Sequence, residues 1–143
     1  MIARVLMALS SGIVLALGVL HLAYTFWGHK LTPRDPAVQV SMARVSPVIT
    51  TENSMWRLWV GFNGSHSMGL ILLGLIFGYL AIAHAPLLFR SWFLLAVGLA
   101  MLSGYLVLGK LYWFSVPFIG IGASLASYVA SIVTSRLIGG VTP

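Results

Sequence analysis

The chain has 143 residues, of which 59% are hydrophobic and only 7% are charged. Soluble globular domains carry about a quarter charged residues and disordered segments are poor in apolar ones, so this composition excludes both classes. The chain has no cysteine, which excludes disulfides, thiolate catalysis and zinc or iron–sulfur centres held by cysteine. The composition therefore predicts an integral membrane protein.

The apolar residues fall into four stretches that are long enough, or nearly so, to cross a membrane. About 20 apolar residues in a helix span the ~30 Å hydrocarbon core of a bilayer. The first stretch resembles a signal peptide, but its apolar run exceeds the usual ~7–15 residues, so we expect a retained span. Short connections at Pro86 and at Gly109-Lys110 favour antiparallel neighbours. The sequence predicts an all-α fold, a four-transmembrane-helix antiparallel bundle in a single membrane domain (1–143), with spans at about 5–28, 56–83, 87–108 and 115–137.

One long polar connection, residues 29–55, separates the first and second predicted spans. It holds both acidic residues of the chain, Asp35 and Glu52. Asp35 is a good N-cap and Pro36 suits the first helical position, so we expect a short amphipathic helix from Pro36 to Val45. This helix would lie at the membrane interface as a lid, because long loops are often functional. The alternative is an interfacial linker with no role.

Positive charge is in excess, with eight Lys and Arg against two Asp and Glu, which gives a net charge of +6. This excess suits anionic lipid headgroups, so we expect membrane lipids as partners. No stretch interleaves basic and aromatic residues as a nucleic-acid surface does, so no nucleic-acid partner is expected. The side with the long loop carries five Lys or Arg and the other side three, which favours a cytoplasmic loop. The signal-like first segment with Arg4 favours an extracytoplasmic loop instead, and the sidedness stays open.

The apolar runs within the predicted spans contain no Lys, Arg, Asp or Glu, so the functional candidates among ionisable residues, which are costly to place in a membrane, reduce to histidines. His21 lies near the end of the first span and His66 near the start of the second. Because consecutive spans run antiparallel, both histidines should lie roughly 10–15 Å below the same surface. Tyr24 lies three residues after His21, and Asn63 lies three residues before His66, so each shares a helix face with its histidine. Ser67 directly follows His66. We therefore expect one small polar pocket, capped by the loop.

Imidazole transfers protons near neutral pH and is the commonest metal ligand, so several functions fit this pocket. The leading hypothesis is a site for a lipid-like or other apolar small molecule, where a histidine acts as general base and Tyr24 or Asn63 polarises a carbonyl group. The first alternative is a haem b or metal-binding electron-transfer module with His21 and His66 as ligands. The second is a non-catalytic scaffold or accessory subunit, in which the histidines only fasten helices together. The candidate residues are His21 and His66 for catalysis, and Tyr24, Asn63, Ser67, Trp56 and Trp59 for ligand binding.

Small residues recur at a spacing of four in the second and fourth predicted spans. The patterns are Gly74-xxx-Gly78, Gly120-xxx-Ser124 and Ser127-xxx-Ser131. Helices approach closely where such residues lie, so these faces predict tight intramolecular packing or a homo-oligomer.

Three strings of the chain resemble a family of small bacterial integral membrane proteins with four helices, whose function is uncharacterised. The strings are HLAYTF at residues 21–26, TPRDP at 32–36 and MWRLWVGFNGSHS at 55–67. The resemblance covers about residues 19–80 and implies a four-helix architecture in a bacterial inner membrane. It draws attention to the first two spans and their loop, and it implies no activity, substrate or cofactor.

Overall fold

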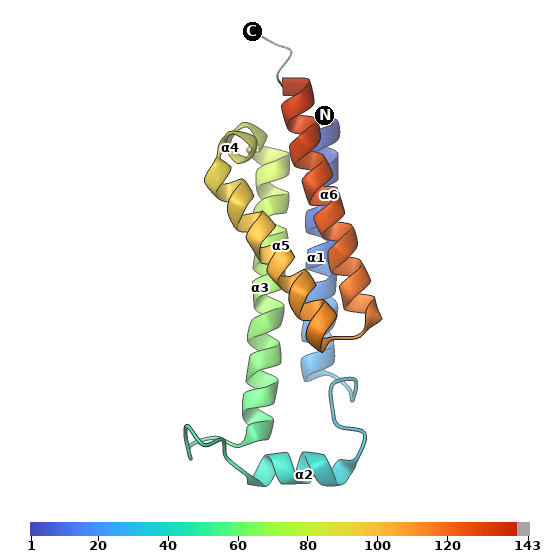
Figure 1. Cartoon of the computed structure of the whole chain (residues 1–143). Coiled ribbons are helices and arrows are strands. Elements are labelled where there is room, and N and C mark those ends of the chain that lie inside the picture. Colours follow the sequence, from blue (N-terminus) through green and yellow to red (C-terminus); the bar gives the residue numbers. More distant parts are fainter. Residues whose placement is uncertain (140–143) are drawn as a thin grey trace. The chain divides into compact units, whose positions relative to one another are not determined.

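A computed structural model describes residues 1–139, and the secondary structure in this range is entirely helical. Four of the helices, α1, α3, α5 and α6, are long and apolar enough to cross a membrane. This confirms the predicted all-α fold with four spans, and the chain is an integral membrane protein. The helices are α1 (Ile2–Phe26), α2 (Pro36–Arg44), α3 (Met55–Ala83), α4 (Ala85–Arg90), α5 (Trp92–Tyr112) and α6 (Ser115–Gly139) (Figure 1).

The third span differs from the expected range of 87–108. Pro86 lies in the first turn of α4, a separate helix of six residues, where the missing N–H of proline costs nothing. Ser91 then caps α5, because its side-chain Oγ accepts the N–H of Leu94 at 3.2 Å. The break at Ser91 divides one expected helix into two, and the span itself begins at Trp92.

The chain divides into two compact units, and α1 and α3 contribute to both. Unit 1 consists of Met1–Leu17 together with the described residues from Leu70 onward. Unit 2 is Gly18–Gly69. Unit 1 therefore holds α4, α5 and α6, whereas unit 2 holds α2 and the long loop.

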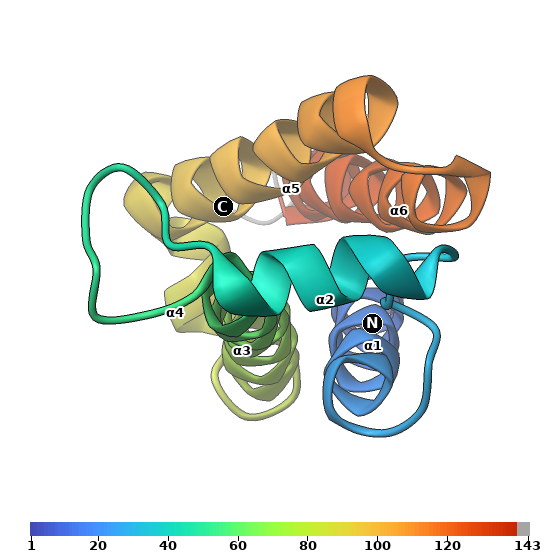
Figure 2. The same ribbon diagram turned by 90° about the horizontal axis from the view of Figure 1, so that it is seen from below.

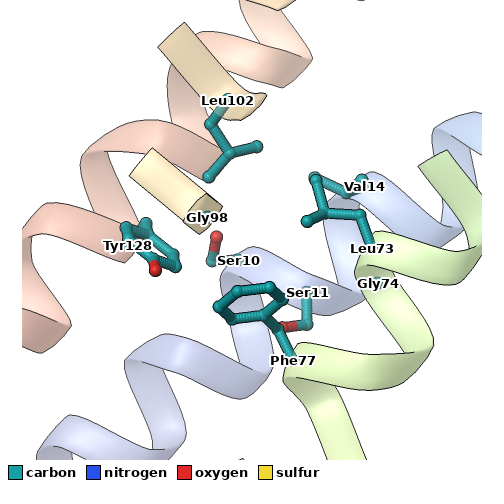
Figure 3. Close-up of a pocket in the computed structure, with 9 residues that line it drawn as sticks. All are labelled: Ser10, Ser11, Val14, Leu73, Gly74, Phe77, Gly98, Leu102 and Tyr128. Carbon is teal, nitrogen blue, oxygen red and sulfur yellow. The ribbon is translucent and has the colours of Figure 1, made fainter. Parts of the chain in front are cut away.

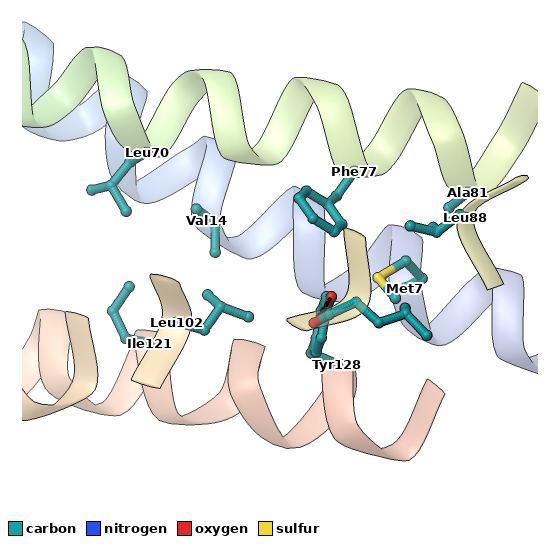
Figure 4. Packing of buried hydrophobic residues seen from close by; sticks show 10 residues of the cluster. Met7, Val14, Leu70, Phe77, Ala81, Leu88, Leu102, Ile121 and Tyr128 are labelled. Atoms are coloured by element: carbon teal, nitrogen blue, oxygen red, sulfur yellow. Dashed lines mark hydrogen bonds between the residues drawn. The ribbon is translucent and has the colours of Figure 1, made fainter. Parts of the chain in front are cut away.

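Unit 1 has a core of large apolar side chains that come from all of its helices (Figure 4). Tyr128 lies edge-on to Phe77, with 5.8 Å between the ring centroids. Its hydroxyl donates to the carbonyl of Leu95 at 2.9 Å, which gives the buried phenol the partner it needs. The other buried members are Met7, Val14, Leu70, Ala81, Leu88, Leu95, Leu102 and Ile121.

Small residues bring α1 close to α3 and α6 within unit 1. Ser124 Oγ donates to the carbonyl of Ser10 at 3.0 Å, and Ser131 Oγ donates to the carbonyl of Ala3 at 2.7 Å. The later residue of α6 pairs with the earlier residue of α1, so the two helices run antiparallel. A Cβ atom on Gly74 would come within 2.8 Å of α1, so this glycine permits the approach of α1 and α3. The predicted small-residue faces thus serve intramolecular packing, while the homo-oligomer stays a prediction.

The core of unit 1 contains a gap of about 10 Å³ (Figure 3). A single water needs about 10–15 Å³ measured in this way, so the gap is too small for a larger ligand. The residues around it are Ser10, Ser11, Val14, Leu73, Gly74, Phe77, Gly98, Leu102 and Tyr128.

In unit 2, α2 runs crosswise past the ends of α1 and α3, as the view from below shows (Figure 2). The predicted short helix is present and is one residue shorter than expected. Its N-cap is Asp35, whose Oδ1 accepts the N–H of Ala37 at 2.8 Å. After α2 the chain returns to α3, where the N–H of Met55 donates to the carbonyl of Val45 at 2.8 Å. The long loop therefore has defined contacts at both ends of α2.

Helix α1 ends at Phe26 rather than at the expected residue 28. The N–H of Trp27 still donates to the carbonyl of Ala23 at 2.8 Å and completes the last turn. Gly28 then adopts a φ of +96°, a left-handed conformation that glycine tolerates and other residues rarely adopt. This glycine directs the chain from α1 into the loop.

Candidate functional site

The two candidate histidines and Asn63 meet within unit 2. His21 projects from α1, while Asn63 and His66 project from α3. The Nε2 atom of His21 lies 3.0 Å from Oδ1 of Asn63. The rings of His21 and His66 are in edge contact, with 5.3 Å between their centroids and an interplanar angle of 76°. The predicted proximity of the two histidines is therefore confirmed.

A hydrogen bond to the backbone fixes the orientation of the Asn63 amide. Its Nδ2 donates to the carbonyl of Trp59 at 2.8 Å, and a carbonyl can only accept. Oδ1 is therefore the atom that faces His21, which requires the Nε2 of His21 to carry a hydrogen and to donate it. In a neutral imidazole the Nδ1 atom is then the acceptor. The amide of Asn63 thus selects the tautomer of His21.

A second set of bonds holds the helix segments that carry these residues. Ser67 is fully buried, and its Oγ donates to the backbone carbonyl of Asn63 at 2.8 Å. Thr25 Oγ1 donates to the backbone carbonyl of His21 at 2.8 Å. A Cβ atom on Gly64 would lie 3.3 Å from the ring of Phe26, so α1 and α3 are close here. The predicted candidate Ser67 supports Asn63 from its own helix.

Beside this network unit 2 has a hollow of about 320 Å³. Four of the predicted site residues, Tyr24, Trp56, Trp59 and Asn63, lie in its wall. Ser67 and the two histidines do not belong to this wall, and His21 connects to the hollow through Asn63. The remaining wall residues are Thr25, Phe26, Gly28, His29, Leu31, Thr32, Gln39 and Val60.

The long loop and α2 supply one side of the hollow. The indole Nε1 of Trp59 donates to the carbonyl of Leu31 at 3.1 Å and fastens the loop to α3. Gln39 of α2 and His29 of the loop also belong to the wall. Gln39 was not among the predicted site residues, although it is the only glutamine of the chain and lies on the predicted lid helix. Lys30 lies close by, with Nζ 5.9 Å from the ring centroid of Tyr24.

The walls combine large apolar surfaces with a few hydrogen-bonding groups. Trp56, Val60 and Phe26 are apolar or largely so, whereas Asn63 and Gln39 carry amides that donate and accept. Small-molecule sites are typically lined in this way and have volumes of about 300–1,000 Å³. The hollow is at the lower end of that range.

The cofactor alternatives fit this geometry poorly. Two axial histidines hold haem iron from opposite faces of a porphyrin, but the rings of His21 and His66 touch each other, and Nε2 of His21 is bonded to Asn63. Zinc and similar metal ions take three or four protein ligands. Among residues 1–139, no group of three or more His, Cys, Asp or Glu is placed to hold a metal ion.

Comparison of the chain with protein-family models, with curated proteins and with solved structures finds no match. The resemblance to a bacterial four-helix family therefore stays an expectation from the sequence.

Proposed function

We propose that this integral membrane protein binds a small lipid-like molecule in the hollow of unit 2. The hollow would take an apolar tail between aromatic side chains and a polar head beside Asn63. The observation that carries the proposal is the position of Asn63. This residue is only 8% exposed, belongs to the wall of the hollow, and is hydrogen-bonded to His21.

The amide of Asn63 retains hydrogen-bonding capacity for such a head. An amide has two N–H donors and an oxygen with two lone pairs. The bond to the carbonyl of Trp59 uses one N–H, and the bond from His21 uses one lone pair. Within residues 1–139, one N–H donor and one lone pair of this amide remain, and they match a hydroxyl or carbonyl group better than a hydrocarbon.

Acid–base chemistry is the further part of this proposal. Asn63 holds His21 in one tautomer, as the third member of a catalytic triad orients its histidine. The Nδ1 atom of His21 would then be the general base, with His66 in ring contact beside it. Such a reaction requires the head of the ligand to reach past Asn63, whereas binding alone does not.

Ligand retention tests the proposal with a matched pair of tryptophan variants. Trp56 lies in the wall of the hollow, whereas Trp27 is highly exposed and does not belong to this wall. Native mass spectrometry of protein released in mild detergent and incubated with 1-decanol should show equal occupancy in the wild type and in Trp27→Ala. Trp56→Ala should lose occupancy by about tenfold or more, because a tryptophan that a ligand covers is a typical binding hot spot. Equal occupancy in all three proteins, or no bound decanol in the wild type, would contradict the proposal.

The rival function is a scaffold in which these residues only fasten α1 to α3. It is favoured by the network of His21, Asn63 and Trp59, because polar side chains often join membrane helices. Asn63→Leu separates the two functions. A purely structural network predicts lower thermal stability with unchanged decanol occupancy, whereas the binding proposal predicts that occupancy falls as well.

A further inference from the structure

Three arginines gather at one end of unit 1. Arg4 is in the first turn of α1, Arg90 is the last residue of α4, and Arg136 is near the end of α6. These parts of α1, α4 and α6 lie at the same end of the unit (Figure 1). The bond from Ser131 to Ala3 joins the first and the third of these helix segments. We call Arg4, Arg90, Arg136 and Trp92 the arginine end.

No carboxylate side chain of unit 1 can neutralise the arginine end. The only acidic residues of the chain are Asp35 and Glu52, and both belong to unit 2. All three arginines are exposed. Guanidinium groups stay charged at every physiological pH, so their counter-charge must come from outside the unit. The membrane offers such a charge in the phosphates of anionic lipids.

Trp92 contacts one of these guanidinium groups. The Cζ atom of Arg136 lies over the Trp92 ring, 4.1 Å from its centroid. A guanidinium group that stacks on an aromatic ring keeps its in-plane N–H donors for a bidentate bond to phosphate. Trp92 and Phe93 are 69% and 76% exposed, and tryptophan is typical of the level of lipid headgroups.

We propose that the arginine end binds the phosphodiester headgroup of an anionic phospholipid. Arg90 and Arg136 hold the phosphate, and the acyl chains lie along the exposed rings of Trp92 and Phe93. Arg4 adds positive charge at the same end. This site uses no residue of the hollow in unit 2, so it is independent of the proposed ligand there.

Lys110 provides a matched control in the same unit. It lies roughly 27 Å from Trp92 along α5, at ~1.5 Å per residue. Its Nζ also lies over an aromatic ring, 5.6 Å from the centroid of Phe118. Lys110→Gln thus removes one positive charge and the same kind of cation–ring contact as Arg136→Gln, at the other end of the helix.

The test is native mass spectrometry of the protein released from nanodiscs that contain equal amounts of phosphatidylglycerol and phosphatidylcholine. The wild type should retain phosphatidylglycerol over phosphatidylcholine by about fivefold or more, as expected where each basic side chain adds about that factor. The double variant Arg90→Gln/Arg136→Gln should retain both lipids equally, while Lys110→Gln should behave as the wild type. An unchanged preference in the double variant, or an equal loss in Lys110→Gln, would overturn the proposal.

Two further arms cover misfolding and the source of the phosphate. Arg136→Lys keeps the charge but lacks the planar fork, so it should fold and show a reduced preference. An unchanged preference in Arg136→Lys together with an unchanged one in Trp92→Leu would also overturn the proposal. Inorganic phosphate added in excess should leave the lipid preference unchanged, and full displacement by phosphate would show that the site takes the free ion instead.

Discussion

Asn63 is hydrogen-bonded within unit 2 both to α1, through His21, and to its own helix, through the carbonyl of Trp59. Leucine has nearly the same size but neither donates nor accepts. Asn63→Leu should therefore destabilise the protein by about 1–3 kcal/mol, the usual cost of leaving a buried polar partner unsatisfied. Chemical denaturation in detergent micelles measures this change. Asn53→Leu, the same substitution at the other asparagine, should change stability by less than about 0.5 kcal/mol, and similar losses at both positions would contradict the assignment.

Gly98 tests the close packing of α5 in unit 1. A Cβ atom there would lie 2.7 Å from Cζ of Tyr128 and 2.8 Å from the Phe77 ring. Gly98→Ala should therefore destabilise the protein by about 1–3 kcal/mol through overpacking. Gly104 is on the same helix and has nothing within 4 Å of its Cβ position, so Gly104→Ala should leave the melting temperature unchanged or raise it. A lower melting temperature in Gly104→Ala alone would show that the packing of α5 is different.

At the scale of elements, α2 depends on its N-cap because the helix is short and has no buried residue. The Oδ1 atom of Asp35 accepts the N–H of Ala37 at 2.8 Å. Asp35→Ala should cost about 0.5–2 kcal/mol and speed hydrogen exchange across residues 36–44, whereas Asp35→Ser should retain protection. Hydrogen–deuterium exchange read by mass spectrometry measures both variants. Equal protection in the wild type and Asp35→Ala would mean that contacts other than the cap hold α2 in place.

The sequence predicts the elements well where a local signal marks them. The N-cap Asp35 followed by Pro36 identifies α2, and Pro86 correctly marks a connection. The separate α4 was not expected, because the cap at Ser91 has no distinctive pattern around it. The end of α1 depends on the positive φ of Gly28, and a glycine after an apolar run does not by itself fix the last helical residue.

The candidate site is predictable only in part, for a physical reason. The depths of His21 and His66 follow from counting residues along antiparallel helices. The count places both histidines at a similar depth, which predicts that their rings lie close together. The wall of the hollow depends on how the loop folds back, which includes the bond from Trp59 to Leu31 and the position of Gln39. Such contacts join residues far apart in the sequence, and no local pattern encodes them.

At the scale of the whole molecule, four spans predict which positions are reachable from water. The chain has no cysteine, so single cysteines can be introduced cleanly. In membrane fragments open on both sides, a water-soluble maleimide should label Thr51→Cys in the loop and should not label Leu72→Cys in α3, although both positions are exposed in the isolated protein. Labelling of Leu72→Cys before detergent is added would contradict the assignment of α3 as a span.

The binding proposal is tested most directly by the side-chain amide signals of protein labelled with ¹⁵N-asparagine. The chain has two asparagines, Asn53 and Asn63, so two pairs of signals are expected, and Asn63→Leu identifies one of them. Addition of 1-decanol to the protein in nanodiscs should shift the Asn63 pair and leave the Asn53 pair in place, whereas decane, which lacks a hydroxyl group, should shift neither. An Asn63 pair that does not respond to decanol, or that responds equally to decane, would contradict a polar anchor for a lipid-like ligand in the hollow.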